Sequence, residues 1–109
     1  MISGLISVTH FRSSDSTFAE RAQDALAALA ARPGYLRGTL GRSTDDAAAW
    51  LLVTEWENVG SYRRALGDYD VKLRATPLLG EALDVPSGFE PLTDISADGE
   101  RTEHTSDLA

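Results

Sequence analysis

The segment Ala48–Trp56 (A-A-W-L-L-V-T-E-W) has the strongest strand pattern in the chain, because it is rich in large apolar and β-branched residues and follows the turn-prone Thr44-Asp45-Asp46. Successive side chains of a strand point to opposite faces of the sheet. One face then carries Trp50, Leu52, Thr54 and Trp56, and the other carries Leu51, Val53 and Glu55. Since both faces hold large apolar side chains, we predict a central strand whose two faces are both covered.

Strand and helix patterns alternate along the rest of the chain. An apolar stripe at helical spacing predicts a helix that begins near Thr17 and stops before Pro33-Gly34. Asn58 is a favoured N-cap for the next helix, and Gly67-Asp68 predicts a break in it. In order, the sequence predicts strand Leu5–Phe11, helix 17–31, strand Tyr35–Ser43, strand Ala48–Trp56, a helix after Asn58 with a further short helix from Thr76-Pro77, and strand Val85–Leu92.

This order, strand–helix–strand–strand–helix–strand, is the βαββαβ plan of an α+β ferredoxin-like fold. Such a fold stacks its two helical segments on one face of a four-stranded antiparallel sheet. The other face, which would include Leu51 and Val53, is then left open. Because an exposed apolar face in a chain of 109 residues needs a cover, we predict a homodimer in which a second copy supplies it.

Composition and charge narrow the class of protein. The formal net charge is −7, which argues against nucleic acid as a partner, and no apolar run approaches the roughly 20 residues that span a bilayer. Met1-Ile2-Ser3-Gly4 does not resemble the start of a signal peptide, so we expect a cytoplasmic protein. Beyond Leu92 the chain is polar, with five acidic residues and one arginine. We therefore predict a folded domain over residues 1–92 and a disordered acidic tail over residues 93–109.

Three motifs carry a resemblance to a known family. They are Pro33-Gly34-Tyr35 at the start of a strand, Thr54-Glu55-Trp56-Glu57-Asn58 at the end of another, and Tyr62 in the helix that follows. Together, over about residues 4–92, the chain resembles the antibiotic biosynthesis monooxygenase family of dimeric α+β barrels. The resemblance implies a monooxygenase-type oxidoreductase that needs no cofactor and acts on a polycyclic phenol, anthrone or quinol.

The resemblance also implies site residues. Trp56 and Tyr62 match a tryptophan and a tyrosine that line the pocket of anthrone-oxidising members, and we expect them to be the catalytic pair. Those members have an asparagine where this chain has Leu52, and a histidine near the position of Arg42. The residues expected to bind a small aromatic substrate are Trp50, Leu52, Thr54, His10 and Arg42.

Other interpretations of the same residues remain open. The tryptophans and Tyr62 also fit a purely structural core, and His10 fits a hydrogen-bonded strand residue. We expect no metal site, because the chain has no cysteine and its two histidines lie in the first strand and the tail. Two alternative functions remain. One is a non-catalytic dimeric module that binds small molecules, and the other is a polyketide cyclase or isomerase of the same architecture.

Overall fold

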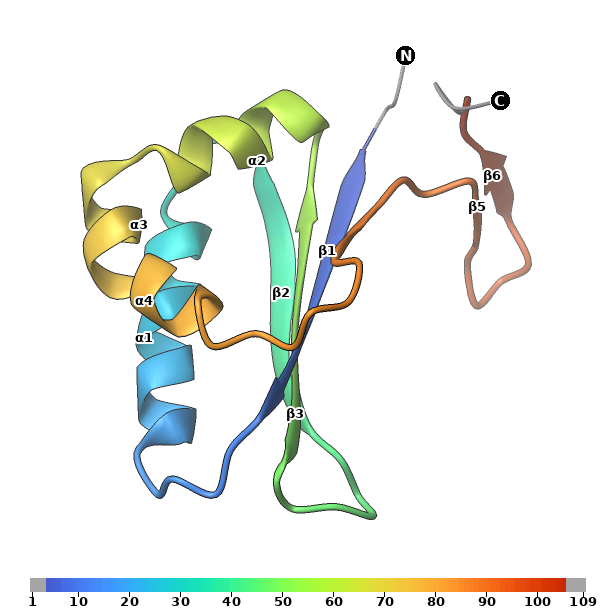
Figure 1. Ribbon diagram of the computed structural model, residues 1–109. Coiled ribbons are helices and arrows are strands. Elements are labelled where there is room, and N and C mark those ends of the chain that lie inside the picture. Colours follow the sequence, from blue (N-terminus) through green and yellow to red (C-terminus); the bar gives the residue numbers. More distant parts are fainter. Residues whose placement is uncertain (1–3, 106–109) are drawn as a thin grey trace.

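The computed structural model describes residues 4–105, and Figure 1 shows helices gathered on one side of a twisted sheet. Within these residues, β2, β3, β1 and β4 form, in that order, a four-stranded antiparallel sheet. The α+β ferredoxin-like prediction is thus confirmed. The elements are β1 (Leu5–Arg12), α1 (Phe18–Ala30), β2 (Tyr35–Arg42), β3 (Ala49–Trp56), α2 (Val59–Leu66), α3 (Tyr69–Arg74), α4 (Thr76–Leu79), β4 (Gly88–Phe89), β5 (Thr93–Ile95) and β6 (Arg101–Glu103).

The register of β1 against β3 decides which side chains share a face. Ser7 lies opposite Thr54, and Thr9 lies opposite Leu52. Along β3, alternate residues are buried beneath the helices, as the sequence predicts. The buried positions are Trp50, Leu52, Thr54 and Trp56. The helix-facing side of the sheet therefore mixes large apolar groups with small hydroxyl-bearing ones.

Helix α1 supplies the other half of the core. Its apolar stripe packs on the sheet, and Phe18 lies 5.0 Å from the ring of Trp50, measured between ring centroids. The stripe comes close to β2 because Gly38 lacks a side chain. A β-carbon there would lie 2.5 Å from the Tyr35 hydroxyl and 2.7 Å from Leu26 Cδ1. The buried residues of α1 are Phe18, Ala22, Ala25, Ala28 and Leu29.

The junction between α1 and β2 holds the start of α2 in place. Gly34 has a φ of +89°, which residues with a β-carbon seldom adopt. Its carbonyl accepts a hydrogen bond from the N–H of Glu57 at 2.8 Å. The side chain of Asn58 caps α2 by accepting the N–H of Ser61 at 2.8 Å. The orientation of α2, which carries Tyr62, therefore depends on this corner.

The opposite face of the sheet has no helix over it among the described residues. Ile6 and Val8 of β1 lie there beside Leu51 and Val53 of β3, and all four are only partly buried. We call these four residues the open face.

The C-terminal part differs from the prediction in two ways. The last strand of the sheet is β4, with only two residues, in place of the predicted Val85–Leu92. The predicted disorder of the tail is wrong for residues 93–103, because β5 and β6 pair as a hairpin that lies apart from the helices in Figure 1. Its turn runs through Asp98 and Gly99, and Gly99 has a φ of +88°, a left-handed conformation that glycine adopts readily. Residues 106–109 of the predicted tail lie outside the described residues.

Candidate functional site

A cavity of about 230 Å³ lies between the sheet and the helices, close to the centre of β1. Its walls come from β1, α2, the end of α4 and the segment 82–87 that leads to β4. Apart from His10, the residues around it are apolar or carry a hydroxyl group. They include Thr9, Tyr62, Leu66, Leu79, Leu83, Val85 and Ser87. A cavity of this kind can hold a flat apolar molecule and offer it a few hydrogen bonds.

Tyr62 lies at the wall of this cavity with two further aromatic rings behind it. The centroids of the Tyr62 and Trp56 rings are 5.4 Å apart, and Trp56 meets Tyr35 edge-on at 5.5 Å. Rings at such distances attract each other, and these contacts restrict the orientation of Tyr62. Burial raises the pKa of Tyr35 above its usual value of 10.0.

Trp56 itself is only 1% exposed, and its indole N–H donates to Thr54 Oγ1 at 2.8 Å. The N–H is thus already used inside the protein. The structure brings Trp56, Thr54 and Tyr62 together and places Trp56 behind the tyrosine. Leu52 is buried in the same face, 2% exposed, and brings only hydrocarbon.

Three buried hydroxyl groups lie on the helix-facing side of the sheet near Tyr62: those of Ser7, Thr9 and Thr54. Ser7 Oγ donates to the Tyr62 hydroxyl oxygen at 3.3 Å. The hydroxyl of Thr9 has no hydrogen-bond partner among residues 4–105, although Thr9 borders the cavity and is only 7% exposed. The Thr9 hydroxyl is therefore available to form a hydrogen bond with a ligand in the cavity.

Ser7, Thr9 and Tyr35 are members of the site that the sequence does not predict. A signal for the first two was present, because Leu5–Phe11 alternates apolar residues with small polar ones at inward positions 7 and 9. That alternation predicts the strand equally well with the polar side chains turned to solvent. Only the register against β3 shows that they face the helices.

The segment 82–87 forms the outer wall of the cavity with little regular structure. Its backbone is tied to β1 at two points: the N–H of Leu83 donates to the carbonyl of His10 at 2.8 Å, and the N–H of Val8 donates to the carbonyl of Ser87 at 2.7 Å. The side chains of Leu83 and Val85 remain nearly half exposed, at 47% and 48%. This wall is therefore less firmly packed than the sheet behind it.

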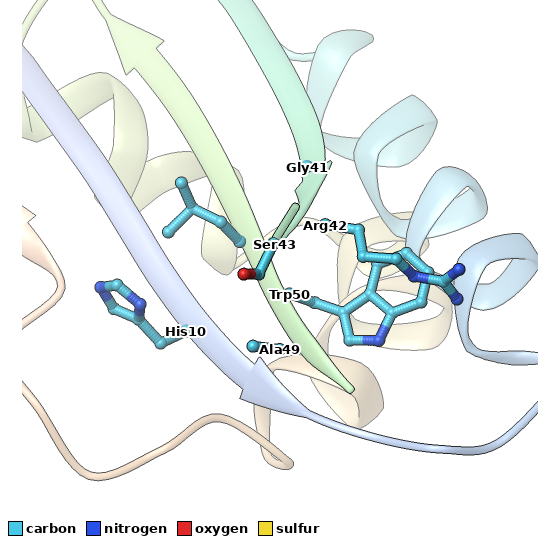
Figure 2. A pocket seen from close by; sticks show the side chains of 7 residues that line it. His10, Gly41, Arg42, Ser43, Ala49 and Trp50 are labelled. Carbon is cyan, nitrogen blue, oxygen red and sulfur yellow. The ribbon is translucent and has the colours of Figure 1, made fainter. Parts of the chain in front are cut away.

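Trp50 and Arg42 lie elsewhere. The Arg42 guanidinium stacks over the Trp50 ring at 4.0 Å, as Figure 2 shows, and the indole N–H donates to the carbonyl of Ser13 at 3.2 Å. Trp50 is six residues before Trp56, about 20 Å away along a strand. Trp50 and Arg42 do not line the cavity of Tyr62, and their role in binding substrate stays a prediction.

His10 is also turned away from the tyrosine. Its side chain is exposed and follows Ile6 and Val8 onto the other side of the sheet. There it lines a hollow of about 290 Å³ together with Gly41, Arg42 and Trp50 (Figure 2). His10 also borders the cavity of Tyr62, and its backbone carbonyl accepts the hydrogen bond from the N–H of Leu83.

Charged groups around the site offer little to a metal ion. Among residues 4–105, no group of three or more histidine, aspartate or glutamate side chains is arranged to hold one. Nor does the described part of the chain contain a helix long and apolar enough to cross a membrane. The chemistry that this site can offer comes from hydroxyl groups in an apolar enclosure.

The fold and the site together define a class of protein. It is a ferredoxin-like domain with an apolar, hydroxyl-bearing cavity between the sheet and the helices. The family model named "Antibiotic biosynthesis monooxygenase" matches residues 1–71. The chain therefore belongs to the antibiotic biosynthesis monooxygenase family, as the motifs predict.

Solved structures share this fold. SnoaB from Streptomyces nogalater, described as a cofactor-independent oxygenase, matches with a TM-score of 0.72 at 23% identity over 82% of this chain and 93% of that chain. A mutant form of SnoaB gives a TM-score of 0.73 with the same identity and coverage. Rv0793 from Mycobacterium tuberculosis matches with a TM-score of 0.70 at 17% identity over 86% of this chain and 100% of its own. No curated protein matches the chain by sequence.

Proposed function

We propose that this protein is a cofactor-independent monooxygenase-type oxidoreductase that acts on a polycyclic phenol, anthrone or quinol. The observation that carries the proposal is the Tyr62 hydroxyl at the wall of an apolar cavity, with its ring supported by Trp56. Membership of the family and the fold shared with SnoaB, a cofactor-independent oxygenase, agree with it.

The chemistry for an anthrone balances with molecular oxygen alone. The substrate's CH₂ carbon loses a proton to solvent and leaves an electron-rich enolate. The enolate carbon gives two electrons to oxygen and forms a carbon–oxygen bond, and the resulting peroxide takes up the proton. Loss of water breaks the oxygen–oxygen bond and leaves a quinone carbonyl. One oxygen atom stays in the product and the other leaves as water.

The protein's contribution is to bind and polarise the substrate. Tyr62 would donate a hydrogen bond to the enolate oxygen, where a fixed donor in a water-poor site stabilises developing charge. Trp56 would act through Tyr62 by holding its ring, and Thr9 would offer a second hydrogen bond. Leu83 and Val85 would shield the enolate from bulk water after the proton has left.

The size of the cavity adds a requirement. At about 230 Å³ it lies below the roughly 300–1,000 Å³ of most sites for drug-sized ligands. A tricyclic substrate would therefore need the segment 82–87 to move outward. Because two backbone hydrogen bonds tie this segment to β1, an outward movement would break few interactions.

A non-catalytic binding module is the second candidate. It is favoured by the hydrocarbon side chain of Leu52, which supplies neither acid nor base, and by the outward position of the His10 side chain. The cyclase or isomerase alternative needs acid–base groups in the cavity and gains no such support. We also propose the homodimer, with residues 1–92 as the domain that dimerises through the open face.

Oxygen uptake separates these functions. Purified protein would be given anthrones, naphthols and quinols in an oxygen electrode, with Tyr62→Phe as the matched variant that keeps the ring. We expect uptake with at least one of these compounds, formation of the quinone, and a clear loss of rate in the variant. Tight binding with flat oxygen traces across the panel would instead establish the binding module. Product formation under nitrogen would point to a cyclase or isomerase.

A further inference from the structure

Ser7 is a polar residue buried in the sheet. It lies in β1 on the helix-facing side of the sheet and is only 4% exposed. On the same strand and face are Leu5 and Phe11, both core residues. An alanine would fill such a position without bringing a hydroxyl group to be satisfied, and burying a hydroxyl costs free energy unless it is hydrogen-bonded. The Ser7 hydroxyl meets this requirement through Tyr62.

The contact between Ser7 and Tyr62 restricts what the phenol can do. Ser7 Oγ donates to the Tyr62 oxygen at 3.3 Å, and it is the sole hydrogen-bond partner of that oxygen among residues 4–105. A hydroxyl group has one proton to donate and two lone pairs to accept with. With one lone pair engaged by Ser7, the Tyr62 proton has to find an acceptor elsewhere. The space that Tyr62 borders is the cavity.

We infer that Ser7 is a positioning residue that holds the Tyr62 hydroxyl as a donor toward the cavity, and that the site thereby selects ligands that present an acceptor oxygen. The inference rests on the proposed function for the identity of the site, and it deepens that function by naming the form of substrate bound. A carbonyl, enolate or phenolate oxygen accepts the Tyr62 proton. A hydrocarbon of the same shape gains nothing from it.

Thr54 already has a hydrogen-bond partner of its own. It lies directly opposite Ser7, and its oxygen accepts the indole N–H of Trp56 at 2.8 Å. The hydrogen bond of Ser7 Oγ among the described residues runs to Tyr62.

A double-mutant cycle tests the inference. Wild type, Ser7→Ala, Tyr62→Phe and the double variant would be titrated with 2-hydroxy-1,4-naphthoquinone, whose anion carries acceptor oxygens and a visible absorption band. Binding would be followed by tryptophan fluorescence. We expect Ser7→Ala to weaken binding by about 2–10-fold, the range of one net hydrogen bond, and to have no further effect when Tyr62 is already phenylalanine. The band of the bound probe should shift alike in both single variants.

Controls separate positioning from packing. Naphthalene should bind wild type and Ser7→Ala equally, and Ser14→Ala, at an exposed serine in the loop after β1, should leave the affinity for the quinone unchanged. Equal losses for quinone and naphthalene, or the same loss from Ser7→Ala with and without the Tyr62 hydroxyl, would overturn the inference. So would a wild type that does not bind the quinone. If Ser7→Ala does not fold, Ser7→Cys keeps the size and weakens the donor.

The same data keep the two proposals apart. Coupling between Ser7 and Tyr62 without oxygen uptake would leave the inference standing and remove the monooxygenase function. Oxygen uptake without coupling would do the reverse.

Discussion

Gly34 combines two constraints at one residue. Its φ is +89°, and a β-carbon would lie 2.3 Å from both Cβ and Oγ of Ser61. A left-handed backbone costs other residues about 1–2 kcal/mol, and overpacking costs a further 1–3 kcal/mol. We expect Gly34→Ala to lower the free energy of unfolding by roughly 2–5 kcal/mol in urea titrations.

Gly67 provides the matched control for that prediction. Its φ is −86°, and a β-carbon there would meet the carbonyl oxygen of Arg64 at an ordinary 3.4 Å. Gly67→Ala should change stability by less than about 1 kcal/mol. Equal effects from the two substitutions would show that the Gly34–Ser61 contact does not constrain the fold.

For single residues, the sequence predicts the face of a strand on which a side chain lies better than the side chains that it contacts. Alternation correctly puts Trp50 and Trp56 on one face of β3, since period two follows from strand geometry alone. It cannot show that the first packs on Phe18 and Arg42 while the second packs on Tyr62, because those contacts depend on where the helices cross the strand. The inward positions of Ser7 and Thr9 were missed for the same reason.

Helices α1 and α3 are joined by an ion pair whose strength depends on pH. Arg74 Nη2 lies 2.7 Å from Asp24 Oδ1, and this hydrogen bond holds the pKa of Asp24 below its usual value of 3.8. A carboxyl whose pKa is lower in the folded state stabilises the fold at pH values above its unfolded pKa. That contribution is lost as pH falls through the lowered folded value.

We therefore expect Arg74→Met to lower the melting temperature slightly at neutral pH, with the difference from wild type shrinking as the pH falls below 3.8. The effect should be small because the pair is exposed, and salt should reduce it. Arg63→Met, at an arginine without an ion pair among the described residues, should show no such pH dependence. A difference that stays constant down to the acid limit would assign the effect to packing.

The C-terminal hairpin is a separate element with few ties to the sheet. All residues of β5 and β6 are exposed, and the N–H of His104 donates to the carbonyl of Leu92 at 2.9 Å. We expect removal of residues 93–109 to change the free energy of unfolding by less than about 0.5 kcal/mol, as for other changes at exposed surfaces. A marked drop in melting temperature would mean that the hairpin packs on something, such as a second copy.

Elements with strong local signals were predictable, and those with weak ones were not. The helix after Asn58 breaks at Gly67-Asp68, as predicted, because Asp68 caps α3. The hairpin was not predicted, because a polar, acidic composition is typical of disorder and the turn at Asp98-Gly99 is a weaker signal. The last strand is shorter than predicted, and Pro86 and Pro91, which lack the backbone N–H that sheet pairing uses, flank it.

The open face is the feature of the whole molecule that calls for a partner. Val53 lies at its centre, opposite Val8 in the register. We expect light scattering at micromolar concentration to give twice the chain mass of 11.7 kDa. Val53→Asp should shift the protein toward one copy, because a dimer would bury the new charge.

Leu73→Asp is the control for the dimer, since Leu73 is exposed on α3, away from the open face, with 62% of its surface accessible. It should leave the mass at two copies. A wild type that runs as one chain, or equal dissociation by both substitutions, would contradict dimerisation through the open face.

The loosely tied wall formed by the segment 82–87 has a consequence for how this protein can diverge. Its side chains border the cavity, while its backbone contributes two hydrogen bonds to β1 and no long strand to the sheet. Substitutions or small insertions there would alter the shape offered to a ligand at little cost to folding. Across related chains, we expect this stretch to vary in length and composition, while the aromatic rings behind Tyr62 stay almost unchanged. Changes in this one short segment would then give the same fold new substrates.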